Sequence, residues 1–363
     1  MNTAIRSNRI RGVMIALVIS LGGALDVATG QTPMSATEAA AYKEAKQTAT
    51  ATFLDRSRSR QERLEAAKKL GYPDDATFAA LLAIGVDQKE DDAIRAEALR
   101  RHRYDDKYVA AVLKILSDPD DGGEELDSSL IEDISRRTTF RIPTELRQRI
   151  QAVFRSLLDD RRPRVRLHAY RAAVAAHDPV AVNRLADSLR LGTNVPIPVV
   201  EAIDLLDQDG PLNHIATLRP YLTNRDPQVQ ARATRALAGD RESRPAIVAL
   251  ARDANTPEEV RVSALRALSR EDAEFPAYAI PLLEDPRTST RVREAAMKTV
   301  VGRMNYHAVS PADQIRFAQA VERIATSPQI MAIEAENLRE SARQVQRYIR
   351  QSFPDVQKYY ETR

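Results

Sequence analysis

The chain has 363 residues, of which 43% are hydrophobic, 29% charged and only 5% aromatic, and its formal net charge is +3. It contains no Cys, which excludes disulfides, thiolate chemistry and lipid attachment through a thiol. No Gly/Ser/Pro-rich linker interrupts it, and no segment shows the alternation typical of strands. The composition therefore favours one elongated all-α domain held together by packing.

Residues 1–30 have the features of a secretory signal. An apolar run follows three basic residues, Arg6, Arg9 and Arg11. The run is too short to span a bilayer comfortably, and the small residues before Gln31 suit cleavage at that point. A retained signal anchor is the alternative.

Cleavage before Gln31 would remove three Arg and one Asp, and would lower the formal charge from +3 to +1. Such a chain is a poor partner for nucleic acid, which is bound mainly through basic residues. Without the apolar run, the mature chain 31–363 has no segment for stable membrane insertion. We therefore expect a periplasmic or secreted protein of a bacterial cell envelope.

The mature chain opens with an Ala-rich stretch that predicts a helix over Met34–Leu54, with Thr37 as its N-cap. We expect this helix to form an N-terminal cap over 34–58. The far end differs from the middle as well. Residues 310–353 predict a C-terminal capping hairpin, because a long helical pattern there interleaves Arg with apolar positions.

Between these ends the pattern V-x-x-x-A-x-x-A-L recurs at steps of 31 to 39 residues. Its first positions are Glu62, Ile94, Leu126, Val165, Pro198, Val229, Val260 and Val292. Apolar-periodic segments precede these anchors, as at Pro211–Leu222, Arg244–Ala251 and Phe275–Leu283. The unit is thus predicted to be a helical hairpin that covers its apolar face by stacking on its neighbours.

The clearest copy of the pattern lies in Asp226–Gly239. Asp226 is predicted to be the N-cap, Pro227 the first helical residue, and Gly239 the left-handed residue that ends the helix. The apolar residues between them stand at i, i+4, i+7 and i+8, which places them on one helix face. That face requires a neighbouring helix.

The phrase D-x-x-x-x-V-R-x-x-A-x-x-A-L is seen best as Asp160, Val165, Arg166, Ala169 and Ala172. It resembles HEAT repeats, and the short period is similar to the bacterial phycobilisome-lyase-type subgroup. The resemblance implies a right-handed α-solenoid, an armadillo-type superhelix of about nine helical hairpins. HEAT families often stack Asp and Arg of successive repeats into a buried ladder, and here only Asp160 with Arg166 matches that spacing.

The most loop-like stretch is SDPDDGG, at 117–123, where the repeat spacing slips. Asp118, Asp120 and Asp121 form the one metal-like cluster, and two of them match positions of a calcium loop. The later positions of such a loop lack their acids. We therefore expect no metal here, but an acidic turn that stabilises the N-terminus of the next helix.

No catalytic motif is present: there is no H-E-x-x-H, no phosphate-binding G-x-x-x-x-G-K-[ST] and no G-x-S-x-G. We therefore predict that the protein is not an enzyme and takes no cofactor. One alternative is an enzyme or lyase-like protein with an unrecognised site. Another is a structural spacer in the cell envelope.

Counted from each anchor, positions +3 and +6 point away from the apolar arc and are expected to face a concave groove. Position +6 is basic in six of the eight copies, and the later copies have no acid three residues earlier on the same helix. The candidate binding residues are His168, Arg171, Arg232, Arg235, Arg266 and Lys298. Solvated surface charge is the alternative interpretation.

Together these features predict a non-catalytic, exported scaffold for protein–protein interaction. Extended grooves of helical repeats bind proteins and peptides, and a basic groove selects an acidic protein, peptide or polymer. The sequence carries no signal for an oligomeric state.

Overall fold

The structure is a computed structural model that describes residues 35–71, 73–101, 106–137, 143–210, 213–268, 275–285, 287–306, 309–326 and 333–362. These residues form helices joined by short turns, with no strand among them, which confirms the all-α class. Within the described residues no helix combines the length and apolarity needed to cross a bilayer. The predicted signal lies outside them.

The chain divides into two compact units, 1–71 and 72–363. In the first unit, α1 (Ala36–Leu54) packs on α2 (Arg60–Ala67). The helices of the second unit are α3 (Asp75–Gly85), α4 (Asp92–Arg100), α5 (Asp106–Ser117), α6 (Glu124–Arg137), α7 (Thr144–Ser156), η1 (Leu157–Asp159), α8 (Pro163–Ala175), α9 (Pro179–Leu191), α10 (Val199–Asp209), α11 (Ile215–Leu218), η2 (Arg219–Thr223), α12 (Pro227–Ala236), α13 (Arg244–Arg252), α14 (Glu258–Ala267), α15 (Phe275–Glu284), α16 (Thr290–Asn305), α17 (Pro311–Thr326), α18 (Ile333–Ser352) and α19 (Pro354–Glu361).

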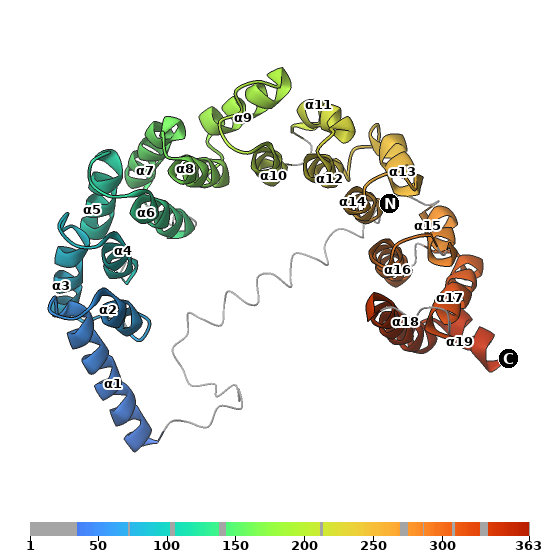
Figure 1. Cartoon of the computed structure of the whole chain (residues 1–363), viewed down its shortest axis with the longest axis horizontal. Coiled ribbons are helices and arrows are strands. Elements are labelled where there is room, and N and C mark those ends of the chain that lie inside the picture. Colours follow the sequence, from blue (N-terminus) through green and yellow to red (C-terminus); the bar gives the residue numbers. More distant parts are fainter. Residues whose placement is uncertain are drawn as a thin grey trace, which may run out of the picture. The chain divides into compact units, whose positions relative to one another are not determined.

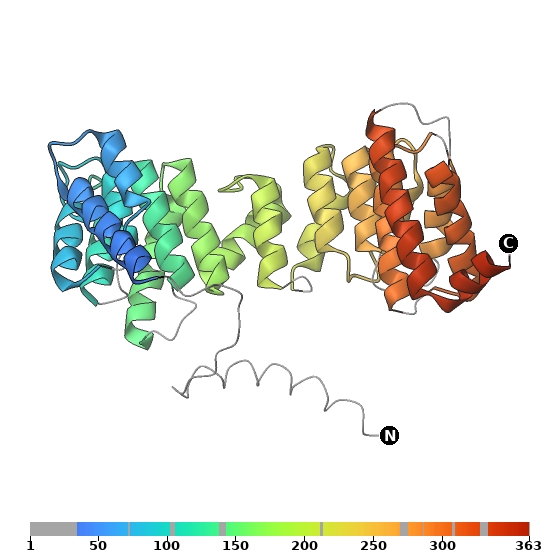
Figure 2. The same ribbon diagram turned by 90° about the horizontal axis from the view of Figure 1, so that it is seen from below.

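The packing order in the second unit follows the chain. The even-numbered helices from α4 to α18 each contact the next one, and the helix before each packs beside it (Figure 1). Figure 2 shows the same order after a 90° turn, with neighbouring helices following the colour sequence. Seven anchors lie within these even-numbered helices, the second helices of their hairpins, or, for Pro198, at the N-cap of one. The eighth, Glu62, lies in α2 of the first unit. The prediction of one helix per anchor is therefore confirmed.

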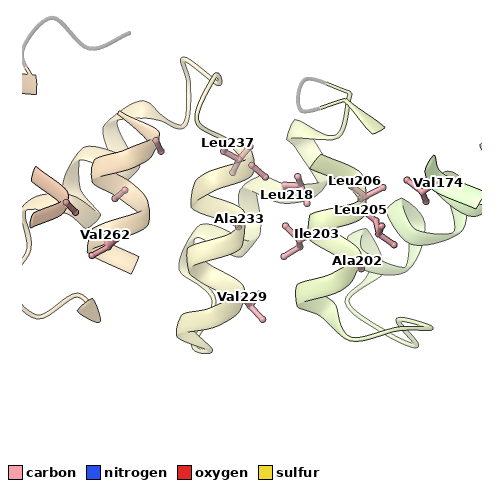
Figure 3. Close-up of a cluster of buried hydrophobic side chains, with 14 of the residues drawn as sticks. Val174, Ala202, Ile203, Leu205, Leu206, Leu218, Val229, Ala233, Leu237 and Val262 are labelled. Atoms are coloured by element: carbon pink, nitrogen blue, oxygen red, sulfur yellow. The ribbon is translucent and has the colours of Figure 1, made fainter. Parts of the chain in front are cut away.

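Helix α12 shows how one copy of the pattern folds. Asp226 accepts a hydrogen bond from the Gln228 N–H at 2.8 Å, and Pro227 is the first helical residue, as predicted. Val229, Ala233 and Leu237 are buried against neighbouring helices (Figure 3). The predicted end at Gly239 is wrong. The helix stops at Ala236 because the chain turns directly afterwards, where the Asp240 N–H bonds to the Leu237 carbonyl.

Two other predicted details also differ. The N-cap of α1 is Ser35 rather than Thr37, because Glu38 stands three residues after Ser35 and completes a capping box with it. The segment Pro211–Leu222 does not form one helix over its described residues. It contains the short α11 and then the 3₁₀-helix η2, in which Pro220 has no N–H to continue an α-helical ladder.

In most copies the side chain after the anchor donates a hydrogen bond to the main chain at the end of the preceding helix. The Nε of Arg63 donates to the Phe53 carbonyl at 2.9 Å, at the end of the preceding helix. Equivalent bonds at ten-residue separation join Arg95 to Gly85 and Arg261 to Ala251. The last carbonyls of a helix have no intrahelical donor. This side chain donates to one of them and so joins the two helices of the hairpin.

Arg166 is also the residue after an anchor, and its contact with Asp160 differs from the predicted pair of side chains. Arg166 Nη1 donates to the main-chain carbonyl of Asp160 at 2.6 Å, so its bond is with the backbone at the end of η1. The Asp160 carboxylate instead accepts three hydrogen bonds from Arg162, two from its guanidinium and one from its backbone N–H. The expected side-chain pair is therefore not formed, because a nearer Arg takes the carboxylate.

Ala233 tests the packing of the repeat. It is fully buried on α12, which contacts both α10 and α14. We expect Ala233→Phe to lower the free energy of unfolding by about 1–3 kcal/mol, because the added ring overpacks a close helix contact. Urea unfolding measures this, with Ala249→Phe at an exposed position of α13 as control. An unchanged unfolding curve for Ala233→Phe would contradict the assigned packing face.

Candidate functional site

Positions +3 and +6 of the second helices lie side by side from one helix to the next. We call these positions on five successive helices the charged row: His168 and Arg171 on α8, Glu201 and Asp204 on α10, Arg232 and Arg235 on α12, Ser263 and Arg266 on α14, and Ala295 and Lys298 on α16. Contacts about one repeat apart join the row, as between Arg171 and Glu201 at 2.8 Å. Its long side chains are partly exposed, while the opposite arc of each helix is buried.

The structure corrects the expectation that the later bases of the row lack acidic partners. Arg235 Nη2 lies 2.5 Å from the Asp204 carboxylate, and Arg232 Nη1 lies 3.5 Å from the other oxygen of that carboxylate. Lys298 lies 3.5 Å from Glu294, one turn earlier on α16. These partners do not stand three residues away on the same helix: Asp204 lies on the neighbouring helix α10, and Glu294 stands four residues before Lys298.

Between α12 and α14 the row encloses a hollow of about 390 Å³. The residues that line it are Gln228, Ala231, Arg232, Arg235, Glu259, Val262, Ser263, Arg266 and Arg291. Its apolar lining is small and buried, since Ala231 and Val262 are 8% and 3% exposed. The hollow exists because Ala231 and Ser263 leave space between long Arg side chains. Three of the six predicted binding residues thus meet at one place.

Arg291 is a lining residue that the sequence argument missed. It stands one position before the anchor Val292, at the start of α16, and therefore outside the two positions considered. Its Nη1 lies 3.6 Å from Glu258, which does not line the hollow. The acid that lines the hollow, Glu259, comes from the first turn of α14. Four guanidinium groups therefore surround a space that has one lining carboxylate.

The remaining predicted residues do not line this hollow. His168 and Arg171 lie on α8, and Lys298 lies on α16. Burial, together with the positive charge of Arg171, lowers the pKa of the His168 imidazole, so this side chain is neutral at pH 7. The α8 part of the row therefore has one cation, Arg171, and that cation is paired with Glu201.

Compared with known proteins, the chain matches no protein-family model and no curated protein. The resemblance to HEAT repeats therefore rests on the phrase V-R-x-x-A-x-x-A-L and on its regular spacing. The function has to be argued from the charged row.

Two acids of the candidate metal loop, Asp118 and Asp121, have partners within the chain. Asp121 is buried and lies 2.6 Å from the Arg95 guanidinium, and Asp118 accepts the Asp120 N–H within the loop. Across the described residues no group of three or more His, Cys, Asp or Glu side chains is placed to hold a metal ion. The acids of this loop serve the local structure instead.

Beside this loop lies a buried ionic cluster that the sequence argument did not identify. Asp127, 1% exposed on α6, lies 2.8 Å from Arg162, which also bonds Asp160. Its Oδ1 has no hydrogen-bond partner. Burial raises the pKa of Asp127 to about 6, even though the Arg162 charge opposes that change. Asp127 occupies the position after an anchor, where most copies have a basic or amide donor.

The chemistry of the hollow is that of carboxylate or other oxyanion binding. Guanidinium groups offer forked N–H donors that match two oxygens of one carboxylate, and they do not titrate in the physiological range. Within the chain, the two oxygens of the Asp204 carboxylate lie next to two different guanidinium groups, those of Arg235 and Arg232. No nucleophile paired with a base lines the hollow among the described residues.

Proposed function

We propose that this protein is a non-catalytic binding scaffold, built as a right-handed α-solenoid of HEAT-like hairpins, that binds an acidic protein or peptide on its charged row. The observation that carries the proposal is the hollow between α12 and α14, where Arg232, Arg235, Arg266 and Arg291 line one space. Repeating helices present an extended surface, and clustered guanidinium groups select carboxylates.

We also propose that the protein acts outside the cytoplasm. The proposal rests on the basic start, the apolar run and the small residues before Gln31. A partner would then be a protein, peptide or polymer of the cell envelope or exterior. Binding of this kind needs no cofactor, because the arginines themselves supply the charge and the hydrogen-bond donors.

Charge reversal of the hollow tests the proposed binding. We expect the double variant Arg235→Glu, Arg266→Glu to weaken binding of a fluorescein-labelled ten-residue glutamate peptide by about 30-fold at low ionic strength. The loss should shrink as salt is added, because exposed charges are screened. Fluorescence anisotropy measures the affinity, with a glutamine peptide of equal length to show that charge is required.

The matched control is Arg184→Glu, Arg190→Glu on α9. These arginines are also exposed, each has an acidic partner, Asp159 or Asp187, and both lie outside the charged row. The net charge changes equally in both double variants. Equal losses of affinity in the two would show that net charge, rather than the hollow, attracts the peptide. Absence of peptide binding by the unaltered protein would overturn the proposed function.

A further inference from the structure

The arginines of the hollow already hold an acid from the same chain. Asp204 on α10 spans two guanidinium groups, with one oxygen 2.5 Å from Arg235 and the other 3.5 Å from Arg232. A second acid one turn later, Asp207, lies 3.8 Å from Arg235 Nε. Helix α10 packs on α12, and no described residue of α10 lines the hollow. The carboxylates of Asp204 and Asp207 therefore offset part of the positive charge of Arg232 and Arg235, although neither acid lines the hollow.

We propose that Asp204 is an internal competitor for the acidic ligand: an incoming carboxylate exchanges with it for Arg232 and Arg235. The inference rests on the proposed function and makes it more specific. The contact with Asp204 shows which chemistry this Arg pair accepts, namely a planar carboxylate whose two oxygens meet two forks. The ligand is thus a protein segment with Asp or Glu side chains.

The exposure of the groups permits this exchange. The side chains of Arg232 and Arg235 are 42% and 48% exposed, whereas the Asp204 side chain is only 19% exposed. The arginine heads can therefore turn toward a ligand while Asp204 stays on α10. Asp207 contacts Arg235, at 3.8 Å, whereas Asp204 contacts both Arg232 and Arg235. Asp204 therefore sets most of the competition.

Removal of the competitor should strengthen binding. We expect Asp204→Asn to bind the labelled ten-residue glutamate peptide about fivefold more tightly at low ionic strength, because one repelling and competing charge is lost. Asp159→Asn on η1 is the matched control, since it removes the same charge from an inter-helix pair with Arg184 outside the row. That control should change the affinity by less than about twofold.

Thermal unfolding of each variant shows whether it is folded at the assay temperature. If Asp204→Asn does not fold, Asp207→Asn provides the same test from the second acid facing Arg235, with a smaller gain expected. Tightening by Asp204→Asn, or by its substitute, beyond the Asp159→Asn control supports the competition. Equal affinities of the row variant and the control overturn it while leaving the proposed function intact. If neither the unaltered protein nor the row variant binds the peptide, the proposed function itself fails.

Discussion

Arg95→Met is expected to lower the free energy of unfolding by about 3–5 kcal/mol, the range found when one member of a buried ion pair is removed. Arg95 is 1% exposed, and its guanidinium lies 2.6 Å from Asp121. Met fills similar volume, so the loss comes mainly from polar groups left without a partner. These are the buried Asp121 carboxylate and the Gly85 carbonyl, which now accepts from Arg95 Nε at 3.1 Å.

The control for this prediction is Arg261→Met, on α14. Arg261 donates to the Ala251 carbonyl at the equivalent position, and no carboxylate of the described residues is paired with it. It should therefore cost about 1–2 kcal/mol, as expected for one hydrogen bond and its unpaired acceptor. Urea unfolding followed by far-UV circular dichroism measures both variants. If both variants lower the free energy of unfolding equally, the Arg95–Asp121 pair adds no stability beyond that of the bond to the preceding helix.

The repeat could be predicted because each copy encodes its second helix locally. Caps such as Asp226 and Pro227, and apolar residues at 3.6-residue spacing, require no knowledge of the neighbours. The first helices carry weaker local signals. Pro220 in η2 converts part of one expected helix into a 3₁₀ turn, which apolar periodicity alone cannot show.

The site could be predicted only in part. Helical geometry correctly placed Arg232, Arg235 and Arg266 at one surface, because the direction of a side chain follows from its position in the repeat. The ion pairs with α10 were missed because those acids lie about 30 residues from their arginines, on an adjacent helix. At position +6 of the aligned repeats, Asp204 and Glu132 are the two acids, and the other six copies have a base. Treating each helix alone hid the effect of Asp204 on Arg235.

The buried cluster around Asp127 also depends on contacts between helices that are far apart in the sequence. Its members come from three successive hairpins: Asp92 on α4, Asp127 on α6, and Asp160 with Arg162 before α8. Arg162 also donates to the Gly122 carbonyl of the irregular loop. The change of repeat spacing in this region was visible in the sequence. Asp127 is buried at a position where most copies have a hydrogen-bond donor. This burial depends on packing between hairpins, so the sequence of a single hairpin could not predict it.

Asp127 should make stability depend on pH in a specific window. Its pKa is about 6 in the folded protein against an ordinary 3.8, because burial and the charges of Asp160 and Asp92 outweigh the opposing charge of Arg162. The folded state therefore keeps a proton that the unfolded chain releases as the pH rises from about 4 to 6. Stability from this group is greatest below that window and is lost across it. The loss amounts to about 3 kcal/mol.

Asp127→Asn should remove this loss, because the amide keeps the shape of the protonated acid and never ionises. We expect the variant to exceed the parent protein in free energy of unfolding by about 2–3 kcal/mol at pH 7 and by almost nothing at pH 4. Urea unfolding at half-unit pH steps measures the difference, in which the titration of all other groups cancels.

Asp178→Asn is the control of opposite sign. The buried Asp178 carboxylate accepts from Arg155 at 2.7 Å and from the Val180 N–H, so its replacement should lower stability at pH 7. A constant difference between Asp127→Asn and the parent from pH 4 to pH 7 would show that the pKa of Asp127 in the folded protein is not raised above its ordinary value.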